Sequence, residues 1–158
     1  MRSVFSNSRA TSQLITSKLY NQDNFYEAFH SDLKRARNRV ILESPFLTMR
    51  RVNALAPQLQ AVLRKSVTVI VNTKPLDEHD TMLQSQAECA VSLLQDIGVH
   101  VLMTVGYHRK VAVIDDVLWE GSLNILSQND SCELMRRMQS EKLSDQMLRF
   151  TGLDKWVK

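Results

Sequence analysis

Four polar side chains lie at short, regular spacing in the last third of the chain: His108, Lys110, Ser122 and Asn124. Side chains two residues apart point to the same face of an extended strand, so His108 shares a face with Lys110, and Ser122 with Asn124. An imidazole acts as a nucleophile or transfers protons, an ammonium supplies charge, and the hydroxyl and carboxamide donate hydrogen bonds. This set suits an anion with tetrahedral oxygens, such as a phosphoryl group, that reacts at the histidine.

A predicted β-hairpin brings these side chains together. Two short apolar runs, Val111–Ile114 and Val117–Trp119, are separated by Asp115-Asp116, which is typical of a tight turn. The returning arm delivers Gly121 and the residues after it back beside the histidine, and glycine lets the backbone approach a ligand closely. We expect Asp115 to stabilise the turn rather than to touch the substrate.

Two short motifs resemble the signature of the phospholipase D-like superfamily: HRKVAVID, which begins at His108, and GSLN, which begins at Gly121. The segment before them fits the same pattern. An apolar strand ends in the sequence ESPF at 43–46, and a long helix ends at Gly98 before the strand that leads to the histidine. The resemblance therefore covers most of the chain from about residue 20 onward.

The resemblance implies a phosphodiesterase that needs neither a metal ion nor a cofactor. In that superfamily one motif histidine attacks phosphorus and forms a phosphohistidine, while a second protonates the leaving oxygen and later activates water. His108 would be the nucleophile, Lys110 and Asn124 would bind the phosphoryl oxygens, and Ser122 would assist. Splitting one displacement into two easier steps is the benefit of covalent catalysis.

The chain contains one such motif, since His30, His79 and His100 are not followed by lysine two residues later. Single-motif members of the superfamily form homodimers in which the two motifs face each other across a twofold axis. A twofold interface places the same residue of both chains near the axis. We therefore expect a homodimer in which His108 of one subunit attacks and the partner's His108 is the general acid.

Two carboxylates are candidates to orient the imidazole of His108, as a carboxylate orients the histidine of other catalytic sites. Glu133 follows the second motif, although the carboxylate of the superfamily commonly lies a little further beyond the asparagine. Glu43, at the end of the first apolar strand, is the second candidate for this role.

Three arginines near the motifs are candidate nucleic-acid contacts: Arg109, Arg136 and Arg137. Guanidinium groups commonly neutralise the phosphates of a bound strand. The alternatives are structural. Arg109 points away from its motif neighbours and would then form a surface salt bridge, whereas Arg136 and Arg137 would be a solvated pair.

The leading hypothesis is a nuclease acting on DNA or RNA, and the motif context favours DNA because it is similar to phospholipase D-like domains of helicases and DNA-processing systems. A net charge of +3 is compatible with such a substrate. The first alternative is a non-catalytic module for nucleic-acid binding and dimerisation. The second is a lipid phosphodiesterase or phosphatidyl transferase, which an apolar pocket beside His108 would favour. The sequence is compatible with endonuclease and with exonuclease action.

Hydrophobic periodicity predicts an α/β fold with a mixed, mainly parallel sheet sandwiched by helices, because strands and helices alternate early in the chain. Capping boxes are expected at Asn24 and Thr81. The predicted helices span 24–37, 54–64, 82–97 and 144–150, and the predicted strands span 39–47, 67–71, 99–104, 111–114, 117–120 and 133–138.

Length and composition predict one domain over residues 21–158, preceded by a polar arm, 1–20, with room for one short strand. The sequence shows neither a signal peptide nor an apolar run long enough to cross a membrane, so we expect a cytoplasmic protein without membrane contact. Cys89 and Cys132 lie in apolar stretches and are expected to be buried thiols.

Overall fold

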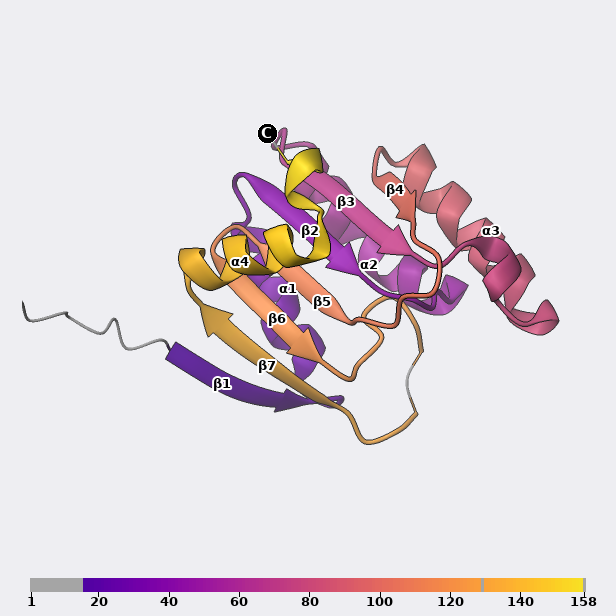
Figure 1. Cartoon of the computed structure of the whole chain (residues 1–158). Coiled ribbons are helices and arrows are strands. Elements are labelled where there is room, and N and C mark those ends of the chain that lie inside the picture. Colours follow the sequence, from indigo (N-terminus) through magenta and orange to yellow (C-terminus); the bar gives the residue numbers. More distant parts are fainter. Residues whose placement is uncertain (1–15, 129, 158) are drawn as a thin grey trace, which may run out of the picture.

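The computed structural model describes residues 16–128 and 130–157 and centres on a seven-stranded sheet with the order β1-β7-β6-β5-β2-β3-β4 (Figure 1). The strands are β1 (Thr16–Asn21), β2 (Arg39–Glu43), β3 (Thr68–Thr73), β4 (His100–Met103), β5 (Val111–Ile114), β6 (Val117–Gly121) and β7 (Leu134–Gln139). The helices are α1 (Phe25–Arg35), α2 (Met49–Leu63), α3 (Thr81–Asp96) and α4 (Glu141–Thr151), with short 3-10 turns η1 (Leu76–Glu78) and η2 (Asp154–Trp156).

The sheet is mixed, as predicted, but the expectation that it is mainly parallel was wrong. Among the described strands, β2–β3 and β3–β4 are parallel pairs, whereas β1–β7, β7–β6, β6–β5 and β5–β2 are antiparallel. A parallel neighbour requires a long crossover, usually a helix, and α2 and α3 supply it only before β3 and β4. The tight β5–β6 hairpin can produce only an antiparallel pair, and the described residues of the loop before β7 contain no crossover helix.

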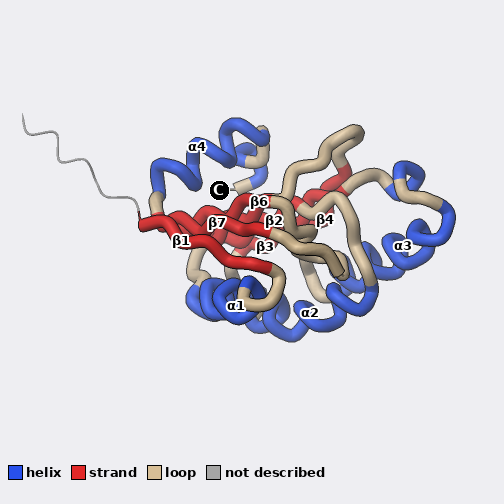
Figure 2. Tube along the Cα trace, turned by 90° about the horizontal axis from the view of Figure 1, so that it is seen from below, coloured by secondary structure: helices blue, strands red, loops and turns tan. Residues whose placement is uncertain are grey.

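Helices cover both faces of the sheet, which confirms the predicted sandwich. Helices α1, α2 and α3 lie on one face and α4 lies on the other (Figure 2). The two faces have separate cores, one large cluster beneath α1–α3 and a smaller one beneath α4. The central strands are buried on both faces, so they carry continuous apolar runs such as Val40–Leu42 and Val69–Val71.

Three of the predicted helix starts were wrong, among them that of α4, which begins at Glu141 rather than at Ser144. Helix α2 begins at Met49 rather than at Ala54. The apolar periodicity did not indicate its first turn, because that turn carries charged side chains ahead of the leucine stripe. Helix α3 is capped by Asp80, whose carboxylate accepts from the backbone N–H groups of Met82 and Leu83, rather than by Thr81.

The predicted capping box at Asn24 is also absent. Its amide oxygen accepts a hydrogen bond from the backbone N–H of Asn21 and makes no cap to α1. Asn21 ends β1, which pairs with β7 at the edge of the sheet. The short strand that the polar arm had room for is therefore present, while residues 1–15 of that arm lie outside the described residues.

Both cysteines are exposed, so the expectation of two buried thiols was wrong. Cys89 falls on the solvent side of α3, between the buried positions Ala87 and Ala90. Cys132 lies in the loop before β7. An apolar neighbourhood in the sequence therefore did not indicate burial at either position.

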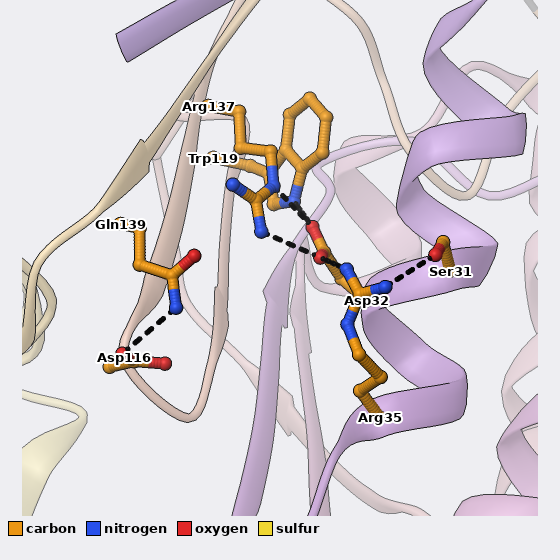
Figure 3. A network of polar contacts seen from close by, with 7 residues as sticks. All are labelled: Ser31, Asp32, Arg35, Asp116, Trp119, Arg137 and Gln139. Carbon is orange, nitrogen blue, oxygen red and sulfur yellow. Dashed lines mark hydrogen bonds and ion pairs between the residues drawn. The ribbon is translucent and has the colours of Figure 1, made fainter. Parts of the chain in front are cut away.

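A buried carboxylate fastens α1 to the sheet (Figure 3). Asp32 is 2% exposed. It accepts from the indole Nε1 of Trp119 at 2.9 Å, from Nε and Nη2 of Arg137, both at 2.8 Å, and from Arg35 at 2.7 Å. These hydrogen bonds to Asp32 raise the pKa of Arg137, against the opposing effect of burial. We call Asp32, Arg35, Trp119 and Arg137 the Asp32 cluster; it joins α1 to β6 and β7.

Candidate active site

The candidate site lies at one edge of the sheet, where five strands begin or end. Strands β2, β3 and β6 end there, and the antiparallel strands β5 and β7 begin there. Lys110 directly precedes β5, Gly121 ends β6, and Glu133 directly precedes β7. The backbone N–H of Gly121 donates to the carbonyl of Lys110 at 3.4 Å, so the two motifs lie side by side.

Lys110 turns its ammonium onto His108. The Nζ atom lies 2.6 Å from Nδ1 of the imidazole and donates to the His108 carbonyl oxygen at 2.8 Å. Lys110 is buried, whereas the side chain of His108 is exposed. The Lys110 charge, followed by burial and the charge of Lys74, lowers the pKa of His108. This shift favours the neutral imidazole, which carries the lone pair that an attack on phosphorus requires.

The ammonium is itself perturbed. Burial lowers the pKa of Lys110, the charge of Glu133 opposes that effect, and Lys74 adds to it. An ammonium that is removed from water and stands close to a second cation gains more from an anionic ligand than a solvated one does. The electrostatics of this edge therefore favour the binding of a negatively charged group.

The Glu133 carboxylate accepts hydrogen bonds from hydroxyl groups near the second motif rather than from the imidazole. The Ser122 hydroxyl donates to one carboxylate oxygen and the Ser131 hydroxyl donates to the other at 2.5 Å. These two hydrogen bonds lower the pKa of Glu133, and Lys110 contributes in the same direction. Ser122 also accepts from the backbone N–H of Leu134 at 3.0 Å, which fixes the turn out of β6 onto β7.

Asn124 lies two residues further along this turn and is partly buried. Its carbonyl oxygen accepts from the backbone N–H of Ser127 at 3.1 Å. Gly121 is required by its surroundings, because a Cβ atom there would lie 2.0 Å from the carbonyl oxygen of Leu134. The GSLN motif is thus built around a close approach of two backbones.

Glu43, the second candidate to orient the histidine, is occupied elsewhere. Its buried carboxylate accepts from Nε and Nη2 of Arg109, both at 2.8 Å, and from the amide of Asn72 at 3.0 Å. The hydrogen bond to Glu43 raises the pKa of Arg109. Within the described residues, no hydrogen bond joins Glu43 or Glu133 to His108.

Side-chain contacts of Arg109 and Tyr107 hold the backbone in place on the two sides of His108. Arg109 follows His108 directly, and Tyr107 precedes it with a buried hydroxyl that donates to the carbonyl of Asn72. Burial raises the pKa of Tyr107, so this hydroxyl stays protonated. The residues flanking His108 are therefore anchored to β2 and β3, while its own ring is left exposed.

Sequence reasoning missed three residues at this edge: Phe46, Lys74 and His79. The Phe46 ring lies 6.0 Å from the His108 ring and 5.9 Å from the His79 ring, and Lys74 Nζ lies 4.8 Å above its centre. Lys74 directly follows β3, which is parallel to β2. Parallel strands end at the same edge, so the position of Lys74 three residues after the predicted strand 67–71 was the available signal.

The remaining candidates lie away from His108. Asp115 is at the opposite end of β5, where its carboxylate accepts from the backbone N–H groups of residues 37–39 at 2.9–3.0 Å. Arg136 and Arg137 point to opposite faces of β7. Arg137 belongs to the Asp32 cluster, and Arg136 donates to the hydroxyl of Ser17 at 2.7 Å on the α4 side.

Two features are absent from residues 16–128 and 130–157. No group of three His, Cys, Asp or Glu side chains is arranged to hold a metal ion among them. None of their helices is both long and apolar enough to cross a membrane.

Several solved structures share this fold. Nuc, a phospholipase D family member from Salmonella typhimurium, superposes with a TM-score of 0.71 and 14% identity over 90% of this chain and 94% of its own. NucT from Helicobacter pylori has a TM-score of 0.70 and 17% sequence identity, over 86% of this chain and 92% of its own. Phosphatidylserine synthase from Haemophilus influenzae Rd KW20 has a TM-score of 0.70 and 12% sequence identity, over 86% of this chain but 36% of its own. No protein-family model and no curated protein matched the sequence. These likenesses confirm the predicted fold.

Proposed function

We propose, from a phospholipase D-like fold that carries His108 and Lys110 at its open edge, that the chain is a phosphodiesterase that cleaves nucleic acid without a metal ion. The contact between Lys110 and His108 carries the proposal. A buried ammonium with a lowered pKa lies against an exposed imidazole with a lowered pKa, so an anion-binding group and a neutral nucleophile are adjacent. That combination is what an attack on a phosphodiester needs.

Binding of the phosphate prepares the nucleophile. The ammonium of Lys110 lies at hydrogen-bonding distance from Nδ1 of the imidazole. A phosphoryl oxygen attracts this ammonium more strongly than a neutral imidazole does, so the bound substrate draws Lys110 away and frees the lone pair. Lys74 adds a second positive charge, and Asn124 donates from the neighbouring turn.

The reaction proceeds in two displacements. The free ring nitrogen of His108 attacks phosphorus, the P–O bond to the leaving group breaks, and that oxygen takes a proton from the partner's His108. The partner's imidazole enters this step protonated, because the negative charge of the bound phosphodiester favours its imidazolium form. Water then attacks the phosphohistidine and gives its proton to the partner's His108, and the P–N bond breaks to restore the free imidazole. The homodimer is part of this proposal because the chain supplies one motif and the reaction needs two histidines.

A cleavage assay in excess EDTA tests this function. Single- and double-stranded DNA and RNA, and the small diester bis(p-nitrophenyl) phosphate, are incubated with the protein and with its His108→Ala variant. The matched control is His100→Ala, which removes an exposed histidine on β4. We expect the protein and the control to cleave and His108→Ala to be inactive. Binding of nucleic acid without cleavage would instead support the non-catalytic module.

The dimer has its own test. Light scattering coupled to size exclusion measures the mass of the particle, and mixing active with His108→Ala chains measures whether the sites are shared. In shared sites, mixed dimers lose activity because each lacks one of the two histidines. Activity that falls only in proportion to the fraction of active chain would contradict a shared site.

A lipid phosphodiesterase is the second candidate, because an apolar hollow adjoins Lys110. The hollow has a volume of about 430 Å³, and the side chains of Leu134, Met147 and Phe150 contribute to its lining. Phosphatidylserine synthase shares the fold. Hydrolysis of phosphatidylcholine in mixed micelles, with no cleavage of any nucleic acid, would favour this candidate over the nuclease.

A further inference from the structure

The α4 face of the sheet has an apolar groove that leads away from the candidate active site. It consists of two adjoining hollows of about 430 and 530 Å³, which share Glu120, Met147 and Phe150 in their lining. Lys110 and Gly121 line the first hollow, so the groove starts at the phosphate-binding motifs. It continues between α4 and strands β6 and β7, which lie beside each other in Figure 1.

Large apolar side chains line this groove but remain open to solvent. Phe150 is 77% exposed at the end of α4, and Leu134 is 51% exposed at the start of β7. Neither contributes substantially to the core, so packing does not account for their size. An exposed aromatic ring beside a phosphate-binding site is a typical feature of surfaces on which nucleic-acid bases stack.

Charge also distinguishes this groove from a pocket for an acyl chain. Arg136 lines the first hollow and Arg149 lines the second, while Glu120 lies between them. Lys110 borders the end nearest the motifs, with its ammonium on His108. An acyl chain in the groove would remove these charged groups from water without pairing them, which is costly. A nucleotide offers phosphates to the guanidinium groups and polar base edges to the carboxylate.

We propose that this groove binds the unpaired bases of a single strand next to the scissile phosphate, with Phe150 as the stacking platform. The proposal rests on the phosphodiesterase function described above and adds a preference for single-stranded nucleic acid. In a duplex each base is already stacked and paired, so its face cannot lie on the Phe150 ring. The strand would enter past Lys74 and His108 and leave over Gly121 toward α4.

Binding measurements with the full chain test the groove separately from catalysis. Fluorescence anisotropy is measured in EDTA with a labelled oligothymidylate and a labelled duplex of the same length, using His108→Ala chains so that no strand is cut. Phe150→Ala is introduced into that background. The matched control is Met82→Ala, which removes another apolar side chain, 86% exposed, at the far start of α3.

We expect Phe150→Ala to weaken binding of the single strand by about fivefold or more, the low end of what one base–aromatic stack contributes. Duplex binding and the Met82→Ala control should be unchanged. A strand with abasic residues should bind more weakly, and Phe150→Ala should have no further effect on it, because the ring then has no base to stack on. Equal loss on intact and abasic strands would overturn the proposal.

The small diester separates the two proposals. Bis(p-nitrophenyl) phosphate has no strand to lie along the groove, so its hydrolysis by the unmodified chain reports on the motifs. If that hydrolysis is present while Phe150→Ala leaves single-strand binding unchanged, the groove proposal fails and the phosphodiesterase stands. If no diester is cleaved but binding depends on Phe150, the enzyme proposal fails and the groove stands as a binding site. Loss of phosphatidylcholine hydrolysis alone in Phe150→Ala would identify an acyl-chain groove and overturn the proposal.

Discussion

The Asp32 cluster and the group around His108 both gather charged side chains at the sheet, but they resolve those charges in opposite ways. In the Asp32 cluster, one buried carboxylate accepts from two guanidinium groups and an indole, so opposite charges meet at 2.7–2.8 Å (Figure 3). Around His108, the close contact joins an ammonium to an imidazole, and Lys74 adds a second cation that lowers the pKa of both.

The difference indicates what each cluster does. A buried ion pair with all its hydrogen bonds satisfied fixes one geometry, and here it fixes α1 against β6 and β7. The His108 group comprises His108, Lys110 and Lys74. Its two ammonium groups repel each other, and a bound anion would offset this repulsion. Residues arranged for binding are rarely those that would maximise stability. Substitutions should therefore separate the two clusters into one that controls folding and one that controls activity.

The largest expected effect is on activity, at His108. Replacing it by alanine should lower the rate of diester cleavage by about three orders of magnitude or more, as for other nucleophiles. Its exposed side chain should leave the free energy of unfolding, measured in urea, nearly unchanged. A large loss of stability would contradict the division between the clusters.

Asp32→Asn should give the opposite result. Removing the charge leaves the guanidinium of Arg137, whose side chain is 16% exposed, without its buried partner. Breaking a buried pair in this way typically costs about 3–5 kcal/mol of unfolding free energy. Turnover per folded molecule should stay unchanged. The matched control is Asp145→Asn, since Asp145 pairs with Arg39 but its side chain is 37% exposed. Such exposed pairs contribute about 0–1 kcal/mol, so an equal cost in both variants would show that Asp32 has no special role.

Lys110→Met tests the electrostatic coupling within the His108 group. The rate should fall by about a hundredfold, the scale for losing one charge-stabilising donor. Without the neighbouring ammonium, the pKa of His108 should rise toward its ordinary value, so the acid limb of the pH–rate profile should move to higher pH. Nuclear magnetic resonance titration of the imidazole measures that shift directly. An unchanged pKa would show that Lys110 does not set the protonation of His108.

Lys74→Gln should have a smaller effect of the same sign. Its charge is the weaker influence on His108, so the rise in the pKa of the imidazole should be less than in Lys110→Met. If Lys74 binds a phosphate, the magnitude of the slope of log affinity against log salt should fall by about 0.7 for single-stranded DNA. A salt dependence equal to that of the unmodified protein would place Lys74 outside the binding path.

The smallest expected effect is on acid stability, through the buried His79. Burial lowers its pKa in the folded state. A lowered folded-state pKa contributes stability that is present above the unfolded value, about 6.5, and is lost as the pH falls through the folded value. The protein should therefore lose stability between pH 7.5 and 5.5, and His79→Leu should lose less. The free energy of unfolding is measured in urea at both pH values. If the unmodified protein and His79→Leu lose equal amounts of it between these two values, His79 does not contribute.

Local patterns in the sequence were sufficient for most of the secondary structure and for the layered fold. Val40–Leu42 and Val69–Val71 are apolar without interruption because their strands are buried on both faces, and the leucine stripe of α2 is visible for the same reason. The two motifs predicted that His108 and Lys110 share one face, and the structure places them in contact. These features depend on residues close together in the chain, where periodicity and spacing carry the information.

The tertiary structure alone decided how distant residues pair. Glu43 and Arg109, 66 residues apart, and Asp32 and Arg137, 105 residues apart, meet because β5 is inserted beside β2 and α1 packs under β7. Sequence reasoning placed Glu43 second, after Glu133, as a candidate to orient the histidine, and it left Arg137 paired with solvent or nucleic acid. The direction of the strands, the position of Lys74 and the groove beside Phe150 were likewise set by the order of strands in the sheet. That order results from packing the whole chain into one fold, and no local pattern of residue types encodes it.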